Sequence, residues 1–237
     1  MPAGVKAFVT TRAGGVSTAS YASFNLGDHV GDDPAAVATN RRLLRSALAL
    51  PSEPCWLRQV HGRGIVRFEG RRSQEPLMAD GAVSAEPGVV LAVLTADCLP
   101  VLLAARDASE VAIVHAGWRG LAAGVIESAV GALGAEPEDL CAWLGPAIGA
   151  AHYEVGEEVR AAFRGSAGAG EAFAPSPRRG HWRCDLAALA RARLRHAGVP
   201  VVLGGGFCTF ADRERFYSYR RDGETGRMAS LIWRAAA

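Results

Sequence analysis

Two apolar runs in the middle of the chain constrain its fold more than any other feature. The first, "VVLAVLTADCLPVLLAA", covers residues 89–105, and the second, "EVAIVHAGWRG", covers residues 110–120. Continuous stretches of Val, Leu, Ile and Ala of this kind are typical of buried β-strands. Each run also contains residues with reactive or polar side chains, which are Asp97 and Cys98 in the first and His115 in the second. A buried strand that stops at such residues can present them at the edge of a sheet.

A third residue of the same chemical kind is His61 in "RQVHG", which also lies near the end of an apolar segment. Strand ends that line up at one edge of a sheet bring such side chains together, and open sites are commonly built there. Two imidazoles and a thiolate suit zinc or copper, and three ligands leave a fourth position of a tetrahedral ion open. We therefore predict a metal site formed by His61, Cys98 and His115.

Spacing alone leaves two other interpretations of these residues open. A cysteine after an apolar strand is commonly a small buried residue, and a histidine there can be a satisfied core residue. Cys98 and His115 could also form a nucleophile and its base. The remaining cysteines are interpreted as packing residues; they are Cys55, Cys141, Cys184 and Cys208.

Two arginines suggest that the chain handles an anion. Arg12 in "TTRAGG" follows an apolar segment and stands beside two glycines, which let ligand atoms approach the backbone closely. Arg119 in "HAGWRG" precedes a predicted helix, whose first amides favour negative charge. Neither pattern matches the dinucleotide fingerprint or the phosphate-binding loop of nucleotide hydrolases.

Composition excludes several classes of protein. A net charge of +2 argues against a dedicated nucleic-acid binder. No apolar stretch reaches the roughly 20 residues that a membrane span needs. The start "MPAGVKAFVTTR" lacks the features of a signal peptide, and five scattered cysteines without a CxxC pair do not suggest a disulfide framework. We expect a cytoplasmic protein without membrane or nucleic-acid partners, and the sequence leaves its oligomeric state open.

Strand-like and helix-like segments intermix without the regular alternation of a doubly wound sheet. The 237 residues are therefore expected to form a single α+β domain over residues 1–237, with mixed sheets. Apolar spacing and capping residues predict helices over residues 34–50, 121–134 and 184–199. The segment 216–234 resembles two strands around a loop.

Ten motifs occur in an order that closely resembles the laccase-domain (YfiH-like) family, also called polyphenol oxidase and peptidoglycan editing factor. They are "TTRAGGVS", "FNLGDHVGDDP", "NRRLL", "QVHG", "AD" at residues 79–80, "LTADCLPVLL", "HAGWRG", "WLGPAIG", "YEVG" and "YSYRRDGETGRMASLIW". They run from about Phe8 to Trp233, which is nearly the whole chain, and "TADC" followed by "HAGWRG" is highly specific. The segment "GAAHYEVG" departs from the pattern, since many members carry proline or cysteine before the aromatic residue.

The resemblance implies an α+β fold with mixed sheets layered against helices. It implies zinc ligation by His61, Cys98 and His115, and it places Arg12 in the active site. Family members phosphorolyse purine nucleosides (adenosine, inosine, guanosine and methylthioadenosine) and deaminate adenosine. Older assignments made them copper-dependent laccases, and some bacterial members are linked to removal of wrongly built cell-wall precursors.

The leading hypothesis is therefore a zinc-dependent purine nucleoside phosphorylase with adenosine deaminase activity, in which Arg12 and Asp97 are catalytic and Arg12 and Arg119 bind substrate. Asp97 could move protons or orient a ligand histidine, or it could be a turn residue at a strand end. The alternatives are a copper-dependent phenol oxidase, a cysteine hydrolase acting on cell-wall precursors, and a binding module without turnover. A full laccase needs several coppers, and six histidines are few for that role.

Overall fold

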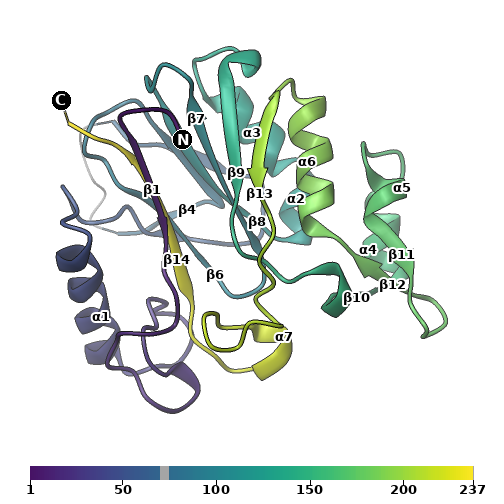
Figure 1. Cartoon of the computed structure of the whole chain (residues 1–237), viewed down its shortest axis with the longest axis horizontal. Helices are drawn as coiled ribbons and strands as arrows, with labels where there is room; N and C mark the ends of the chain where they lie inside the picture. The colour runs from purple at the N-terminus through teal and green to yellow at the C-terminus, as the bar shows by residue number, and fades with distance from the viewer. Residues whose placement is uncertain (70–74, 237) are drawn as a thin grey trace.

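The second half of the first apolar run and the apolar part of the second form the centre of a six-stranded mixed sheet (Figure 1). The computed structural model describes residues 1–69 and 75–236. In spatial order, the strands of this sheet are β13 (Val201–Gly204), β9 (Leu140–Leu144), β7 (Leu99–Ala105), β8 (Val111–Ala116), β5 (Gly81–Ser84) and β3 (Ile65–Arg67). Each of the four central strands is antiparallel to its neighbours within that group, and β13 and β3 run parallel to the strands beside them. Every residue of β7 and β8 is buried, as their continuous apolar composition predicts.

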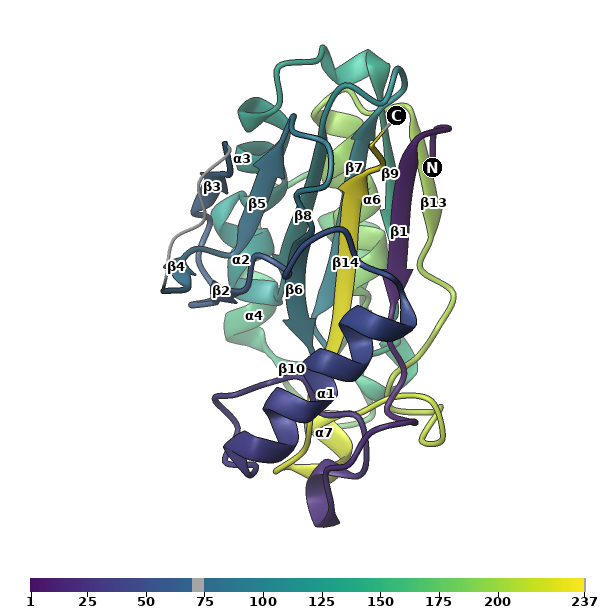
Figure 2. The same cartoon turned by 90° about the vertical axis from the view of Figure 1, so that its left-hand side faces the viewer.

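A second, antiparallel sheet covers one face of the first. Its strands are β1 (Val5–Val9), β14 (Met228–Arg234) and β6 (Leu91–Thr95), with β14 in the middle. Val93 and Ile232 from this sheet pack with Leu102 and Ile113 from the larger one in a shared apolar core. Helix α1 (Pro34–Ala47) covers the outer face of the smaller sheet, as Figure 2 shows. Helices α2 (Trp118–Ala123), α3 (Val125–Ala132) and α6 (Leu186–His196) lie on the opposite face of the six-stranded sheet and form the outer layer there.

The first apolar run is two strands rather than one. Strand β6 lies in the smaller sheet and β7 in the larger, so the chain crosses from one sheet to the other between Thr95 and Leu99. In the antiparallel pair β7–β8, Pro100 lies opposite His115. Cys98 therefore stands at the same edge of the sheet as His115, at the point where the chain changes layers.

The predicted helices form, with one interruption. Asp33 accepts a hydrogen bond from the Ala35 amide and caps α1, and Asp185 does the same for Ala188 at α6 (Leu186–His196). The segment predicted as one helix over residues 121–134 instead belongs to two helices, α2 (Trp118–Ala123) and α3 (Val125–Ala132). They are separated by Gly124, whose φ of +90° lies in the left-handed region that ends a helix.

The prediction of two strands over residues 216–234 is wrong in its first half. Only β14 is a strand, and α7 (Tyr219–Asp222) replaces the other. The Ser218 hydroxyl accepts from the Arg221 amide and caps this short helix, while the Arg220 amide donates to Asp97. These polar contacts occupy backbone groups that a strand ladder would need.

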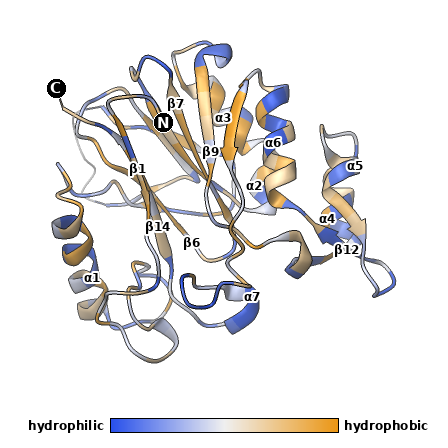
Figure 3. Cartoon of the chain, viewed as in Figure 1, coloured by the Kyte–Doolittle hydropathy of each residue, from blue (hydrophilic) through white to orange (hydrophobic). Residues whose placement is uncertain are grey.

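The remaining elements are short. They are β2 (Leu57–Arg58) paired with β4 (Leu77–Met78), a small sheet of β10 (Glu154–Gly156), β12 (His181–Cys184) and β11 (Phe173–Pro175), helices α4 (Glu157–Ala161) and α5 (Ala169–Ala172), and 3-10 turns at Ala19–Tyr21, Pro137–Asp139 and Ala150–His152. Figure 3 shows apolar colouring along β9 and β13 and mixed colouring on α1 and α6. In the described part of the chain, no helix is long and apolar enough to cross a membrane. The predicted α+β fold is confirmed.

Candidate metal centre

The structure brings together the three residues predicted to bind metal. The ligand atoms of His61, Cys98 and His115 all lie within 4.8 Å of one another, and Cys98 Sγ is 4.0 Å from His61 Nε2. The two imidazole rings meet edge to face, with centroids 4.8 Å apart. Cys98 is half-buried, His115 is buried and His61 is exposed, so the cluster opens to solvent on the side of His61. Within residues 1–69 and 75–236, this is the one group of three or more His, Cys, Asp or Glu side chains arranged to hold a metal.

A buried carboxylate, Asp80, supports two of the ligands. It stands between β4 and β5 and has no exposed surface. Its Oδ1 accepts from the His61 amide at 2.8 Å, and its Oδ2 accepts from the amides of Val60 and Gly62 at 3.2 and 2.6 Å. His61 has a φ of +59°, a left-handed conformation that costs energy in a residue with a side chain and that these bonds stabilise.

The same carboxylate orients the second histidine. His115 Nδ1 lies 2.9 Å from Asp80 Oδ1, and the His115 amide donates to the Asp80 carbonyl at 2.7 Å. Because a carboxylate accepts hydrogen bonds, Nδ1 carries the hydrogen and Nε2 is the ring atom left to bind a metal. Such carboxylate–histidine pairs fix ring orientation and tautomer at metal sites.

The electrostatics of the cluster favour a thiolate. Burial opposes ionisation of Cys98, but the neighbouring His115 and His61 outweigh it and lower the pKa of the thiol to about 6. Burial likewise disfavours a charged His115, but Cys98 and Asp80 raise its pKa to about 9. Burial also disfavours a charged Asp80, yet His115 and the Gly62 amide bring the pKa of its carboxyl below the usual range. Near neutral pH the cluster holds a thiolate beside an imidazolium, whose proton a metal ion must displace.

Gly117 leaves room for Cys98 and His61 to lie close together. A Cβ at Gly117 would lie 3.0 Å from Cys98 Sγ and 3.2 Å from His61 Cδ2. Zinc bonds of about 2.0–2.3 Å in a tetrahedron place ligand atoms roughly 3.3–3.6 Å apart. The observed separations are 4.0 Å between Cys98 Sγ and His61 Nε2 and no more than 4.8 Å within the group, so the side chains would close by about 1 Å around the ion. The donor set and its spacing thus fit a zinc ion with an open fourth position.

Asp97, the residue before Cys98, is tied to two other segments. Its Oδ1 accepts from the Thr209 hydroxyl at 2.6 Å and its Oδ2 from the Arg220 amide at 2.7 Å, while its carbonyl accepts from the Ile148 amide. It is buried and has a φ of +94°. These hydrogen bonds fix the position of Asp97 and of the turn that carries Cys98. Neither carboxylate oxygen bonds a ligand histidine.

The two predicted anion-binding arginines occupy different settings. Arg12 donates through Nε and Nη2 to the Ala22 carbonyl and through Nη1 to the Arg213 carbonyl, and its guanidinium lies 4.8 Å from the centre of the Tyr217 ring. Two of its five N–H donors stay available for an anion. Arg119 is exposed and stacks over Trp118 at 4.5 Å, at the start of α2.

Sequence reasoning missed several residues that shape this site. Asp80 entered only as part of a family motif, and no local signal shows that it meets residues 19 and 35 positions away. Thr209 and Arg220, which hold Asp97, are 112 and 123 residues distant from it. Burial lowers the pKa of Arg227, and the nearby Cys98 and Asp97 partly offset this by favouring its charged form.

A cavity of about 500 Å³ adjoins the segments that lead to the ligands. Its lining includes Gln59, whose side-chain amide exchanges hydrogen bonds with the backbone of Leu94 at 2.9 and 2.7 Å. It also includes Arg41 and Trp56, with the guanidinium 4.4 Å from the centre of the indole ring. The cavity therefore joins flat aromatic surface to polar groups, one of which, Gln59, is two residues before His61 in the sequence. His61, Cys98 and His115 are not among its lining residues.

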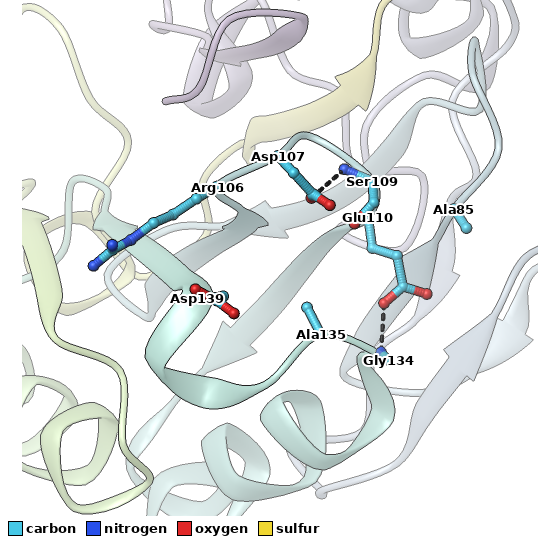
Figure 4. A pocket seen from close by; sticks show the side chains of 8 residues that line it. All are labelled: Ala85, Arg106, Asp107, Ser109, Glu110, Gly134, Ala135 and Asp139. Carbon is cyan, nitrogen blue, oxygen red and sulfur yellow. Dashed lines mark hydrogen bonds between the residues drawn. The ribbon is translucent and has the colours of Figure 1, made fainter.

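A second cavity, of about 570 Å³, lies at the other end of the central strands (Figure 4). It is lined by residues of the β7–β8 turn, including Asp107 and Glu110. Glu110 accepts from Arg67 and from the Gly134 amide, and Asp107 accepts from the Ser109 amide. Because β7 begins beside Cys98 and β8 ends beside His115, this cavity is a full strand length from the metal centre.

Comparison with known proteins identifies the family of this chain. The family model described as "Multi-copper polyphenol oxidoreductase laccase" matches residues 6–235. The chain belongs to this family. It is 54% identical to a protein of Pseudomonas aeruginosa named purine nucleoside phosphorylase, over 98% of this chain and 94% of the relative. It is 50% identical to the purine nucleoside phosphorylase YfiH of Escherichia coli, over 98% of this chain and 95% of that one.

Solved structures of other family members have the same fold. The Neisseria meningitidis protein NMB0706 matches with a TM-score of 0.94 and 45% identity, covering 99% of this chain and 96% of its own. YlmD from Geobacillus stearothermophilus matches with a TM-score of 0.88 and 36% identity, covering 99% and 93%. The resemblance inferred from the motifs is therefore confirmed.

Proposed function

We propose that this protein is a zinc-dependent purine nucleoside phosphorylase with adenosine deaminase activity, acting in the cytoplasm on adenosine, inosine, guanosine or methylthioadenosine. The observation that carries the proposal is the His61–Cys98–His115 cluster, oriented by Asp80, in a chain that matches proteins named purine nucleoside phosphorylase over nearly its full length.

His61, Cys98 and His115 would hold the zinc. Their donor set is one that zinc favours, and the thiolate character of Cys98 supports it. When bound, zinc supplies Lewis-acid chemistry at its open position, which suits attack on the purine ring in deamination. Asp80 holds the His115 proton at Nδ1, so that Nε2 would be the ring atom available to the metal. Copper is a second candidate for the same ligands.

Phosphorolysis needs a phosphate aimed at C1′ of the ribose. Arg12 offers two N–H donors beyond those that its own backbone contacts use, and paired guanidinium donors suit phosphate oxygens. Arg119 adds positive charge near the end of β8. Asp97 is proposed to position Cys98, because both of its carboxylate oxygens are already hydrogen-bonded to Thr209 and Arg220. Its catalytic role in proton transfer stays a prediction from the sequence. The cavity lined by Trp56, with its flat indole surface, is proposed to receive the purine base.

Two alternatives receive less support. A multi-copper phenol oxidase needs several metal centres, whereas the described residues contain one cluster of suitable side chains. A cysteine hydrolase could use the Cys98 thiolate with His115 as its base. That pair does not need His61 as a third donor, yet His61 is held in place by Asp80.

One experiment tests the proposal. Zinc-loaded protein is incubated with adenosine and phosphate, and the products are analysed for adenine, ribose 1-phosphate and inosine. Adenine with ribose 1-phosphate shows phosphorolysis, and inosine shows deamination. Chelation should abolish both activities, and turnover that resists chelation would favour the cysteine hydrolase.

A further inference from the structure

A second thiol–imidazole pair lies outside the metal centre. Cys208 Sγ is 3.5 Å from His152 Nδ1, and the Gly149 amide donates to the same sulfur at 3.2 Å. Both side chains are half-buried. From the sequence, Cys208 is interpreted as a packing residue, and no motif links it to His152, which is 56 residues away. Only the tertiary structure brings the two side chains together.

The fold builds this pair from two distant loops. Ala147 and Cys208 form an isolated parallel bridge, and the Thr209 amide donates to the Ala147 carbonyl at 2.9 Å. The 3-10 turn Ala150–His152 then carries the imidazole back over the sulfur. The His152 ring stacks on Phe210 with centroids 4.7 Å apart and planes 18° apart, which fixes its orientation.

A glycine lets the backbone approach the sulfur. A Cβ at Gly149 would lie 3.2 Å from Cys208 Sγ, so a side chain there would push the thiol away from the amide. The amide N–H stabilises negative charge on the sulfur, and the imidazole can take its proton. A nucleophile, a base within hydrogen-bond reach and a third group that orients the base form the arrangement of an activated thiol.

We infer that Cys208 is a redox-sensitive site, which hydroperoxides oxidise to a sulfenic acid with His152 as the base. His152 accepts the thiol proton, and the sulfur attacks the terminal oxygen of the hydroperoxide. The S–O bond forms as the O–O bond breaks, and its electron pair leaves on the other oxygen. That oxygen takes the proton from His152 and departs as an alcohol, or as water when hydrogen peroxide is the oxidant. The sulfur loses two electrons and the peroxide gains them.

The position of this thiol connects it to the metal centre. Thr209, the next residue, donates the hydrogen bond that holds Asp97, and Asp97 precedes the metal ligand Cys98. The inference itself does not depend on the proposed function, because it concerns a thiol that takes no part in the metal cluster.

Cys141 provides a comparison within the same chain. It is half-buried like Cys208, but burial raises the pKa of its thiol, which disfavours the reactive thiolate. Zinc-loaded protein is treated with hydrogen peroxide and a 1,3-dione that traps sulfenic acids, and labelling of both cysteines is followed by peptide mass spectrometry. We expect Cys208 to be labelled about ten times faster than Cys141, because an imidazole and a backbone amide lie at the Cys208 sulfur.

His152→Phe preserves a ring that can stack on Phe210 but removes the base. Its Cys208 should be labelled within about twofold of the Cys141 rate, whereas His196→Gln on exposed α6 surface should leave labelling unchanged. Thermal unfolding checks that the variants are folded. Equal labelling of Cys208 and Cys141 in the unaltered protein would overturn the inference without any variant, and so would undiminished labelling of Cys208 in folded His152→Phe protein.

Discussion

Replacing Asp80 by asparagine changes one charge at the buried centre of the site while keeping the side chain's shape. The carboxylate accepts four hydrogen bonds, from the amides of Val60, His61 and Gly62 and from His115 Nδ1. An asparagine has one acceptor oxygen, so about two of the four bonds survive and the other two donors face an NH₂ group. Hydrogen bonds to charged groups contribute about 1.5–3 kcal/mol each, which predicts a loss of about 3–6 kcal/mol in the free energy of unfolding.

The same change should weaken metal binding. Loss of a partner that orients a ligand histidine typically lowers metal affinity by about 10–100-fold. Zinc affinity is measured by competition with a chromogenic chelator, and the free energy of unfolding by urea titration of the metal-free protein. Asp107→Asn, in the cavity at the opposite end of the central strands, is the control and should change the free energy of unfolding by about 0.5 kcal/mol or less.

Two results would contradict this role of Asp80. If Asp80→Asn binds zinc as tightly as the unaltered protein, the carboxylate does not orient the ligands. If zinc affinity falls but the free energy of unfolding is unchanged, the two hydrogen bonds lost in Asp80→Asn contribute nothing to stability. Either result would require a different explanation for the burial of an aspartate at this position.

Further predictions concern the ligands, the phosphate and the packing of the site. Zinc binding needs Cys98 as a thiolate and His115 as a neutral imidazole, whose pKa values are about 6 and about 9. Zinc affinity should therefore rise about tenfold per pH unit between pH 6 and 9, change little above pH 9 and fall more steeply below pH 6. A flat pH profile in zinc titrations would contradict this. Cys98→Ala should leave the protein folded but without zinc by elemental analysis. Arg12→Ala should reduce phosphorolysis about 10–100-fold more than deamination in parallel product assays, and equal losses would argue against phosphate binding. Gly117→Ala should lower zinc affinity about tenfold because its Cβ meets two ligands, whereas Gly131→Ala, with open space around it in α3, should raise the free energy of unfolding by about 0.5–1 kcal/mol.

Local sequence determined the elements whose stabilising contacts are close in the chain. Strands β7 and β8 follow from continuous apolar runs, because strands buried on both faces need no polar residues. Helices α1 and α6 follow from Asp33 and Asp185, whose side chains cap amides only two or three residues away. The grouping of His61, Cys98 and His115 was also predicted, from strand ends and from family motifs.

Other features depended on contacts between distant residues, and only the tertiary structure decided them. No local pattern shows that the chain changes sheets around Cys98, because β6 and β7 have the same apolar composition. Asp80 acquires its role only when β4 and β5 bring it to His61 and His115. The expected strand before β14 is absent because Arg220 bonds Asp97, 123 residues earlier. Sequence patterns report short-range preferences, whereas these bonds form only after folding has closed long loops of chain.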